Sequence, residues 1–201
     1  MLAKEERRLG MESYLDARLE EIFYERTLET FEYFHVNKDK LLSSLMSAIG
    51  EARVAVEPSI NSGSKQRIKF VQFSYLLSAA KMNKLILKID MYDARHYGDL
   101  ISDGGYWDYS ELFPYINEDM QLLRDELSKR FLRIKDYEIA DIRLYYHTGI
   151  FQMMWAVLME LAIEETFLEI LSEEFEPTVH ILFGAYLDKA EVVGTISKGA
   201  E

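Results

Sequence analysis

Cysteine is absent from the 201-residue chain. This absence excludes disulfides, thiolate catalysis, and the zinc or iron–sulfur sites that depend on cysteine ligands. The N-terminal segment is charged and helical in character, and it lacks the apolar stretch of a secretory signal. Together these absences predict a cytoplasmic protein.

Basic residues are in the minority. The chain has 23 Lys and Arg against 35 Asp and Glu, which gives a net charge of −12 and a pI near 4.9. Duplex binding relies on Lys and Arg to neutralise phosphates, so direct nucleic-acid binding is disfavoured. The acidic surplus could suit a basic partner or mimic nucleic acid, although solubility is its simplest explanation.

A membrane-spanning run is also missing. The most apolar stretch, Ile150 to Ile163, is interrupted by Gln152 and Glu160, and a spanning helix needs about 20 apolar residues. Proline and glycine are absent between Gly149 and Pro177, so nothing in that stretch breaks a helix. The sequence therefore predicts no membrane span, and instead a buried central helix over 148–175 in which Trp155 and Met159 are fully packed.

The remaining patterns predict the other elements. Helical spacing indicates a first helix over about 4–36, a second helix capped by Asn37 or Asp39, and a third over 117–135. The clearest loop is 58–64. Strand patterns predict hairpins from 67–77 with 85–93 and from 179–187 with 191–196. Residues 137–147 alternate like a strand, although they could also be the front of the central helix.

This order predicts an α+β fold. Its mainly antiparallel sheet is built from two hairpins and packs against a long central helix and N-terminal helices. We expect one domain over 1–201, with a helical N-terminal part at 1–57 and a mixed α/β part at 65–197. The N-terminal helices carry too much apolar surface to stand alone.

The stretch 90–110 has the densest load of chemically active side chains. Its candidate catalytic residues are acids around one histidine, namely Asp90, Asp93, His96, Asp99, Asp103 and Asp108. Carboxylates near a histidine could act as general acid and base or bind a hard metal. Their spacing matches no EF-hand, so the alternative is a polar loop with aromatic anchors packed on the sheet.

Other candidates have weaker patterns. Glu32 and His35 form a single E-x-x-H pair, whereas di-iron bundles need two. Glu160 lies inside the apolar run, where a carboxylate needs a partner such as Arg143 or a tyrosine. His147 and His180 fall on predicted strands, on the more polar faces. No nucleotide-binding, metalloprotease or hydrolase motif is present, and we predict neither a metal nor a cofactor.

The first predicted helix has an unusually broad apolar surface. Tyr14, Tyr24, Leu28 and Phe31 widen its stripe and are the candidate interaction residues. The leading hypothesis is a protein-interaction or regulatory protein that contacts a protein partner or itself, as an oligomer or part of an assembly. One alternative is a hydrolase-type enzyme with its site at residues 90–109, and a second is an acidic decoy of nucleic acid.

Overall fold

The computed structural model describes residues 2–101, 104–131, 133–163 and 172–198. The helices are α1 (Leu2–Asn61), α2 (Leu77–Lys81), α3 (Ile116–Arg130) and α4 (Asp136–Ala162), with short 3-10 turns η1 (His96–Gly98) and η2 (Ser110–Leu112). The strands are β1 (Ile68–Tyr75), β2 (Ile86–Tyr92), β3 (Gly105–Asp108), β4 (Phe175–Ala185) and β5 (Ala190–Ser197). The predicted α+β class is confirmed.

The described strands form one five-stranded sheet in the order β3-β2-β1-β4-β5. Both predicted hairpins, β1–β2 and β4–β5, are antiparallel, and a parallel pairing of β1 with β4 joins them. The short helix α2 lies in the first connection. Strand β3 was predicted as loop; it pairs with β2 so closely that a Cβ on Gly104 would lie 1.6 Å from the Ile89 oxygen.

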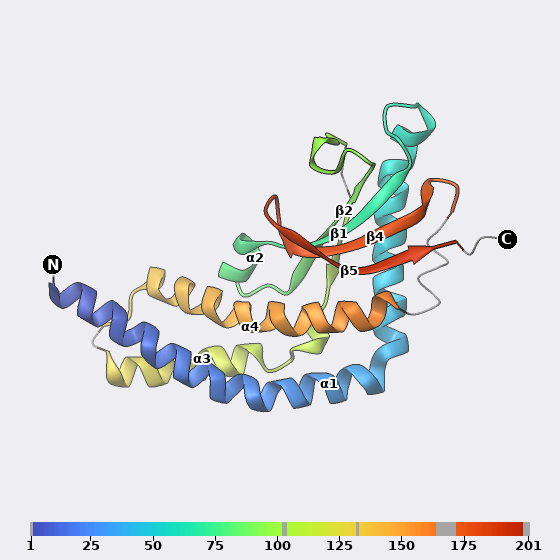
Figure 1. Cartoon of the computed structure of the whole chain (residues 1–201). Helices are drawn as coiled ribbons and strands as arrows, with labels where there is room; N and C mark the ends of the chain where they lie inside the picture. The colour runs from blue at the N-terminus through green and yellow to red at the C-terminus, as the bar shows by residue number, and fades with distance from the viewer. Residues whose placement is uncertain (1, 102–103, 132, 164–171, 199–201) are drawn as a thin grey trace.

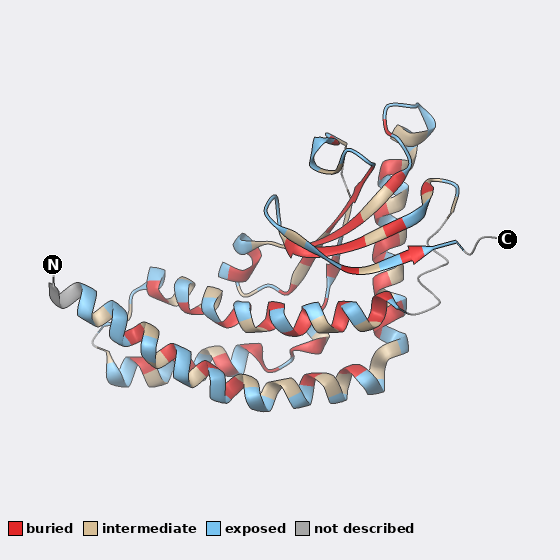
Figure 2. Ribbon diagram, in the orientation of Figure 1, coloured by how far each residue is buried: buried red, intermediate tan, exposed pale blue. Residues whose placement is uncertain are grey.

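The helices cover one face of the sheet. Helix α4 lies between the sheet and a layer formed by α3 and the first part of α1, while the second part of α1 rises beside the sheet and contacts β2 and β3 (Figure 1). The apolar residues between these layers are buried (Figure 2). The cluster includes Leu45, Ala52, Val71, Phe73, Ile89, Met154, Val157, Leu158 and Ile181. The buried side of α4 therefore forms the centre of the core.

Helix α1 kinks where two helices were predicted to meet. Asn37 has non-helical backbone angles (φ −112°, ψ 16°), and its side-chain amide donates to the Tyr33 carbonyl at 2.9 Å. The Asn37 side chain thus provides a donor to a carbonyl at the C-terminal end of the first part of α1, and it does not cap the N-terminus of the second part. The start of the loop predicted at 58–64 is wrong, because helix α1 continues through Pro58 to Asn61. Proline costs one hydrogen bond there, close to the end of the helix.

The predicted strand over 137–147 is wrong, because these residues form the first half of α4. Ile142 and Tyr146 alternate with polar residues, but they also lie four residues apart and face the core as one helical stripe. Gly149 does not break the helix. A Cβ at Gly149 would lie 2.3 Å from the Phe23 ring, so the glycine allows α1 and α4 to approach closely.

The second half of α4 differs from its prediction in two respects. Met153, Val157 and Leu158 are buried as expected, but Trp155 and Met159 are each 38% exposed, so their predicted burial is wrong. The helix ends at Ala162, and Pro177 lies inside β4. Positions 164–171 of the predicted helix lie outside the described residues.

Helix α3 is shorter than predicted and ends at Arg130. Its acidic first turn and basic last turn are present, as the helix dipole favours. Among the described helices, including the apolar α4, none combines the length and hydropathy that a bilayer crossing requires.

Candidate functional site

The acids of the 90–110 stretch are held by basic side chains and amides of nearby segments. The Asp93 carboxylate accepts from the Arg95 guanidinium at 2.9 Å and from the Gln66 amide at 3.2 Å. Arg95 holds the pKa of Asp93 at about 2, below its ordinary value of 3.8. Asp99 is bound by the buried Lys65 ammonium and by the Asp93 amide. These two carboxylates fix the loop onto the start of β1.

His96 lies apart from those carboxylates, above the outer face of the sheet. Its Nε2 is 3.1 Å from Gln72 Oε1, and its ring contacts Phe70, Tyr92 and Tyr97 with centroids 4.1–5.1 Å away. Burial lowers the pKa of His96. His96 also has φ of +51°, a left-handed conformation that is rare outside glycine and asparagine. The partners of this histidine are thus an amide and aromatic rings.

The remaining predicted acids of the stretch are dispersed. Asp90 is fully buried on β2 and accepts from Lys88 at 2.5 Å. Asp108 is exposed and accepts from the Ser110 amide. Asp103 lies outside the described residues. Among the described residues, no group of three or more His, Cys, Asp or Glu is placed to hold a metal ion.

The candidates with weaker sequence patterns do not come together in a site either. Glu32 and His35 are both exposed on α1. Glu160 is half-buried on α4, and its suggested partner Arg143 donates instead to the Lys81 carbonyl at 3.1 Å. His180 is on β4 as predicted and lies 3.1 Å from the Thr195 hydroxyl.

His147 is on a helix and not on a polar strand face, so its predicted position is wrong. It is completely buried, with Nε2 3.3 Å from the Asn83 side-chain oxygen. Burial, with a smaller effect of Arg143, lowers the pKa of His147 to about 4, so the imidazole is neutral at pH 7.

A buried polar cluster between α1, α3 and α4 was missed by the sequence reasoning. Asp119 accepts from Arg26 at 2.7 and 3.0 Å and from the Tyr146 hydroxyl at 2.6 Å. Thr30 and Tyr115 form a second hydrogen bond beside it, and burial raises the pKa of Tyr115 to about 12. One signal could have found it, because Arg26 and Thr30 follow Ile22 at helical spacing on the buried stripe.

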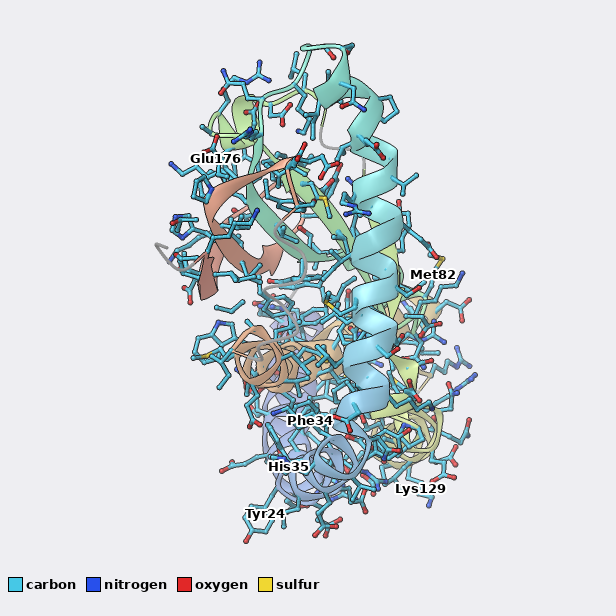
Figure 3. The ribbon with its side chains drawn as sticks, turned by 90° about the vertical axis from the view of Figure 1, so that its right-hand side faces the viewer. Tyr24, Phe34, His35, Met82, Lys129 and Glu176 are labelled. Atoms are coloured by element: carbon cyan, nitrogen blue, oxygen red, sulfur yellow. The ribbon has the colours of Figure 1, made fainter. Side chains whose placement is uncertain are left out.

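The predicted interaction residues of α1 divide into two pairs. Tyr14 donates to Glu126 at 2.7 Å and contacts Phe131, and Phe31 packs against the core. Tyr24 and Leu28 are 77% and 60% exposed. Figure 3 shows Tyr24 at the edge of the molecule, pointing away from the helical layer.

A cleft of about 620 Å³ opens between α4 and the sheet, at the end where β1 and β4 finish. Thr148, Phe151, Gln152 and Trp155 line it from α4. Tyr75, Phe183, Lys189 and Glu191 line it from the sheet and the β4–β5 turn. Tyr75 stacks on Phe151 with centroids 3.9 Å apart, so the wall is aromatic.

Comparisons with protein-family models, with curated proteins and with solved structures found no match.

Proposed function

We propose that this chain is a protein-interaction protein whose binding surface is the outer face of the first part of α1, and that its partner is a basic amphipathic helix. The observation that carries the proposal is the exposure of Tyr24 and Leu28, one helical turn apart. Each can bury apolar area against a partner, at about 25 cal/mol per Å². Aromatic anchors of this kind dominate binding energy at many interfaces.

The charge of this face identifies the kind of partner. Arg18 and Arg26 turn toward α3, where they pair with Glu126 and Asp119. The outer face keeps exposed acids beside Tyr24 and Leu28, namely Glu20, Glu25 and Glu32, and none of the three has a basic partner within the described part of the chain. A second copy of this face would set acids against acids, whereas a lysine- or arginine-rich helix would be complementary.

The hydrolase alternative has less support. It requires His96 and at least two of the loop acids to converge in a cleft, as a general acid–base pair needs. His96 contacts an amide and aromatic rings, while Asp93 and Asp99 are bound by Arg95 and Lys65. The acidic face of α1 favours the interaction proposal instead.

Fluorescence anisotropy with a labelled model helix, built from Leu and Lys at amphipathic spacing, tests the proposal. The double substitution Tyr24→Ser and Leu28→Ser should weaken binding at least tenfold, because both apolar anchors are lost. Glu25→Lys should weaken it further as like charges meet, and added salt should weaken binding to the unaltered protein. Met82→Ser is the matched control, because Met82 is 59% exposed and lies away from α1's outer face (Figure 3).

Two outcomes would overturn the proposal. One is an equal loss of binding in the Met82→Ser control, which would indicate unspecific adhesion. The other is a dimer in light scattering that the Tyr24 and Leu28 substitutions dissociate, because the face would then serve a second copy of the chain.

A further inference from the structure

The cleft between α4 and the sheet has the size and lining of a small-molecule site. Its volume of about 620 Å³ falls within the roughly 300–1,000 Å³ typical of ligand pockets. Its lining residues come from α4, the sheet and adjoining turns, and none of them belongs to α1. The first part of α1 lies on the other side of α4 from the sheet (Figure 1). A function for this cleft is therefore separate from binding at Tyr24 and Leu28.

The aromatic side chains of the cleft offer a flat surface. Trp155 keeps 38% of its surface exposed, whereas Trp107 in the sheet keeps 1%. Behind it, Tyr75 stacks on Phe151 at an interplanar angle of 15° and contacts Phe183 with centroids 5.8 Å apart. Burial raises the pKa of Tyr75, so its phenol stays neutral. An exposed indole beside a packed aromatic wall is suited to stack a planar ring.

The polar groups of the cleft favour a neutral ligand. Lys189 and Glu191 at its rim carry opposite charges and lie 3.6 Å apart, so together they add no net charge. Gln152 lines the cleft from α4, and its amide can both donate and accept hydrogen bonds. The lining thus offers hydrogen-bond donors and acceptors but no net charge that would attract a charged ligand.

We propose that this cleft binds a neutral, planar heteroaromatic ring whose edge both donates and accepts hydrogen bonds, in the manner of a nucleobase. The ring stacks on Trp155, and its edge faces Gln152 and the Lys189–Glu191 pair. This also accounts for the exposure of Trp155, whose position within the apolar run of α4 predicts burial.

The test uses 2-aminopurine riboside, a neutral fluorescent heteroaromatic ring with donor and acceptor groups, titrated against the full chain. We expect one saturable site. Trp155→Ala should weaken binding about five- to 150-fold, because base–aromatic stacking contributes about 1–3 kcal/mol. Gln152→Leu should weaken it about three- to tenfold, the effect of losing net hydrogen bonds. Neither residue belongs to the buried core cluster, although Trp155 keeps only 38% of its surface exposed.

The comparison probes and a matched control separate this proposal from general stickiness. Naphthalene has the ring without the polar edge, so its binding should fall with Trp155→Ala but not with Gln152→Leu. Gln66→Leu is the control, because Gln66 is exposed just before β1, at the opposite end of that strand from the cleft. Circular dichroism checks that each variant is folded.

Three results would overturn the proposal. The first is the absence of saturable 2-aminopurine riboside binding at millimolar concentration. The second is an equal effect of Gln66→Leu and Gln152→Leu. The third is tighter binding of the anionic probe 1-anilinonaphthalene-8-sulfonate at the same site, since the ligand class would then not be neutral. The Tyr24 and Leu28 substitutions should leave riboside binding unchanged, so this proposal and the proposed function can fail independently.

Discussion

Three buried carboxylates hold distant segments of the chain together. Asp93 and Asp99 fasten the 90–110 stretch to the start of β1, and Asp119 joins α3 to α1 and α4. Buried carboxylates of this kind need charged or hydroxyl donors to offset the loss of hydration. Substitution of these residues should therefore change stability first.

Asp119→Asn keeps the shape of the side chain and removes its charge. Arg26 would then lose the carboxylate that raises its pKa, while remaining partly buried. Breaking a buried ion pair costs about 3–5 kcal/mol, and the partial exposure of Arg26 places the expected loss near the lower end of that range. Urea unfolding measures it. Asp125→Asn on the same helix is exposed and should change the free energy of unfolding little, so equal losses would contradict the role of Asp119.

His147 should make stability depend on pH. Its pKa falls from an ordinary 6.5 to about 4, because burial disfavours the imidazolium form. Below pH 6.5 His147 is protonated in the unfolded chain, whereas in the folded chain it stays neutral until about pH 4. The stability is therefore complete above pH 6.5 and falls as the pH drops toward 4, by about 3 kcal/mol.

The variant His147→Gln tests this pH dependence through urea unfolding at several pH values. Its curve should be flatter than that of the unaltered protein between pH 6.5 and 4. The exposed His35→Gln serves as the control and should keep the original slope. An unchanged slope in His147→Gln would show that other groups cause the loss.

At the scale of elements, the hairpins were predictable and the boundaries of the helices were not. Alternation and turn residues identified β1–β2 and β4–β5, because one side of each strand is buried. Residues 137–147 were wrongly predicted as a strand because Ile142, Leu144 and Tyr146 fit a period of two. The stripe from Ile142 through Tyr146 to Ile150 fits a helix equally well. The packing of α4 against α1, α2 and the sheet, which the sequence does not show, distinguishes the two.

Candidate sites were harder to predict than elements because they depend on pairings between distant segments. The sequence indicated a dense group of acids. It did not indicate that Lys65, which is 34 residues away from Asp99 in the chain, forms an ion pair with Asp99. The cleft could not be predicted either, since Tyr75 and Phe151 meet only when β1 lies across α4.

Two helical glycines should respond to alanine in opposite directions. A Cβ at Gly149 would lie 2.3 Å from the Phe23 ring, where α1 crosses α4, whereas a Cβ at Gly50 meets nothing within 4 Å. Alanine favours a helix over glycine by about 1 kcal/mol. Gly50→Ala should therefore stabilise by up to about 1 kcal/mol, while overpacking should make Gly149→Ala destabilising by about 1–3 kcal/mol.

Thermal unfolding of the two glycine variants compares them directly. Phe23→Leu combined with Gly149→Ala should recover part of the loss, because the smaller side chain can make room for the methyl group. Stabilisation in both single variants would show that α1 and α4 can separate without cost.

At the scale of the whole molecule, one apolar core joins the helical layer and the sheet across the described part of the chain. The described core includes Leu15 on α1, Leu123 on α3, Met154 on α4 and Ile196 on β5. Helix α1 belongs to both layers, since its first part packs in the helical layer and its second part contacts β2 and β3 (Figure 1). The expectation of one domain therefore predicts that the two layers unfold cooperatively.

Unfolding should occur in one transition, whichever layer is observed. Trp107 reports on the sheet, where it is buried and its indole nitrogen donates to Ser44 of α1 at 3.2 Å. Trp155 reports on α4, and circular dichroism is dominated by the helices. In Trp155→Phe, where only Trp107 fluoresces, the urea midpoint should coincide with that from circular dichroism, because neither layer can keep its apolar face covered once the other has unfolded. Separate midpoints would mean that the kink at Asn37 divides two units that fold independently.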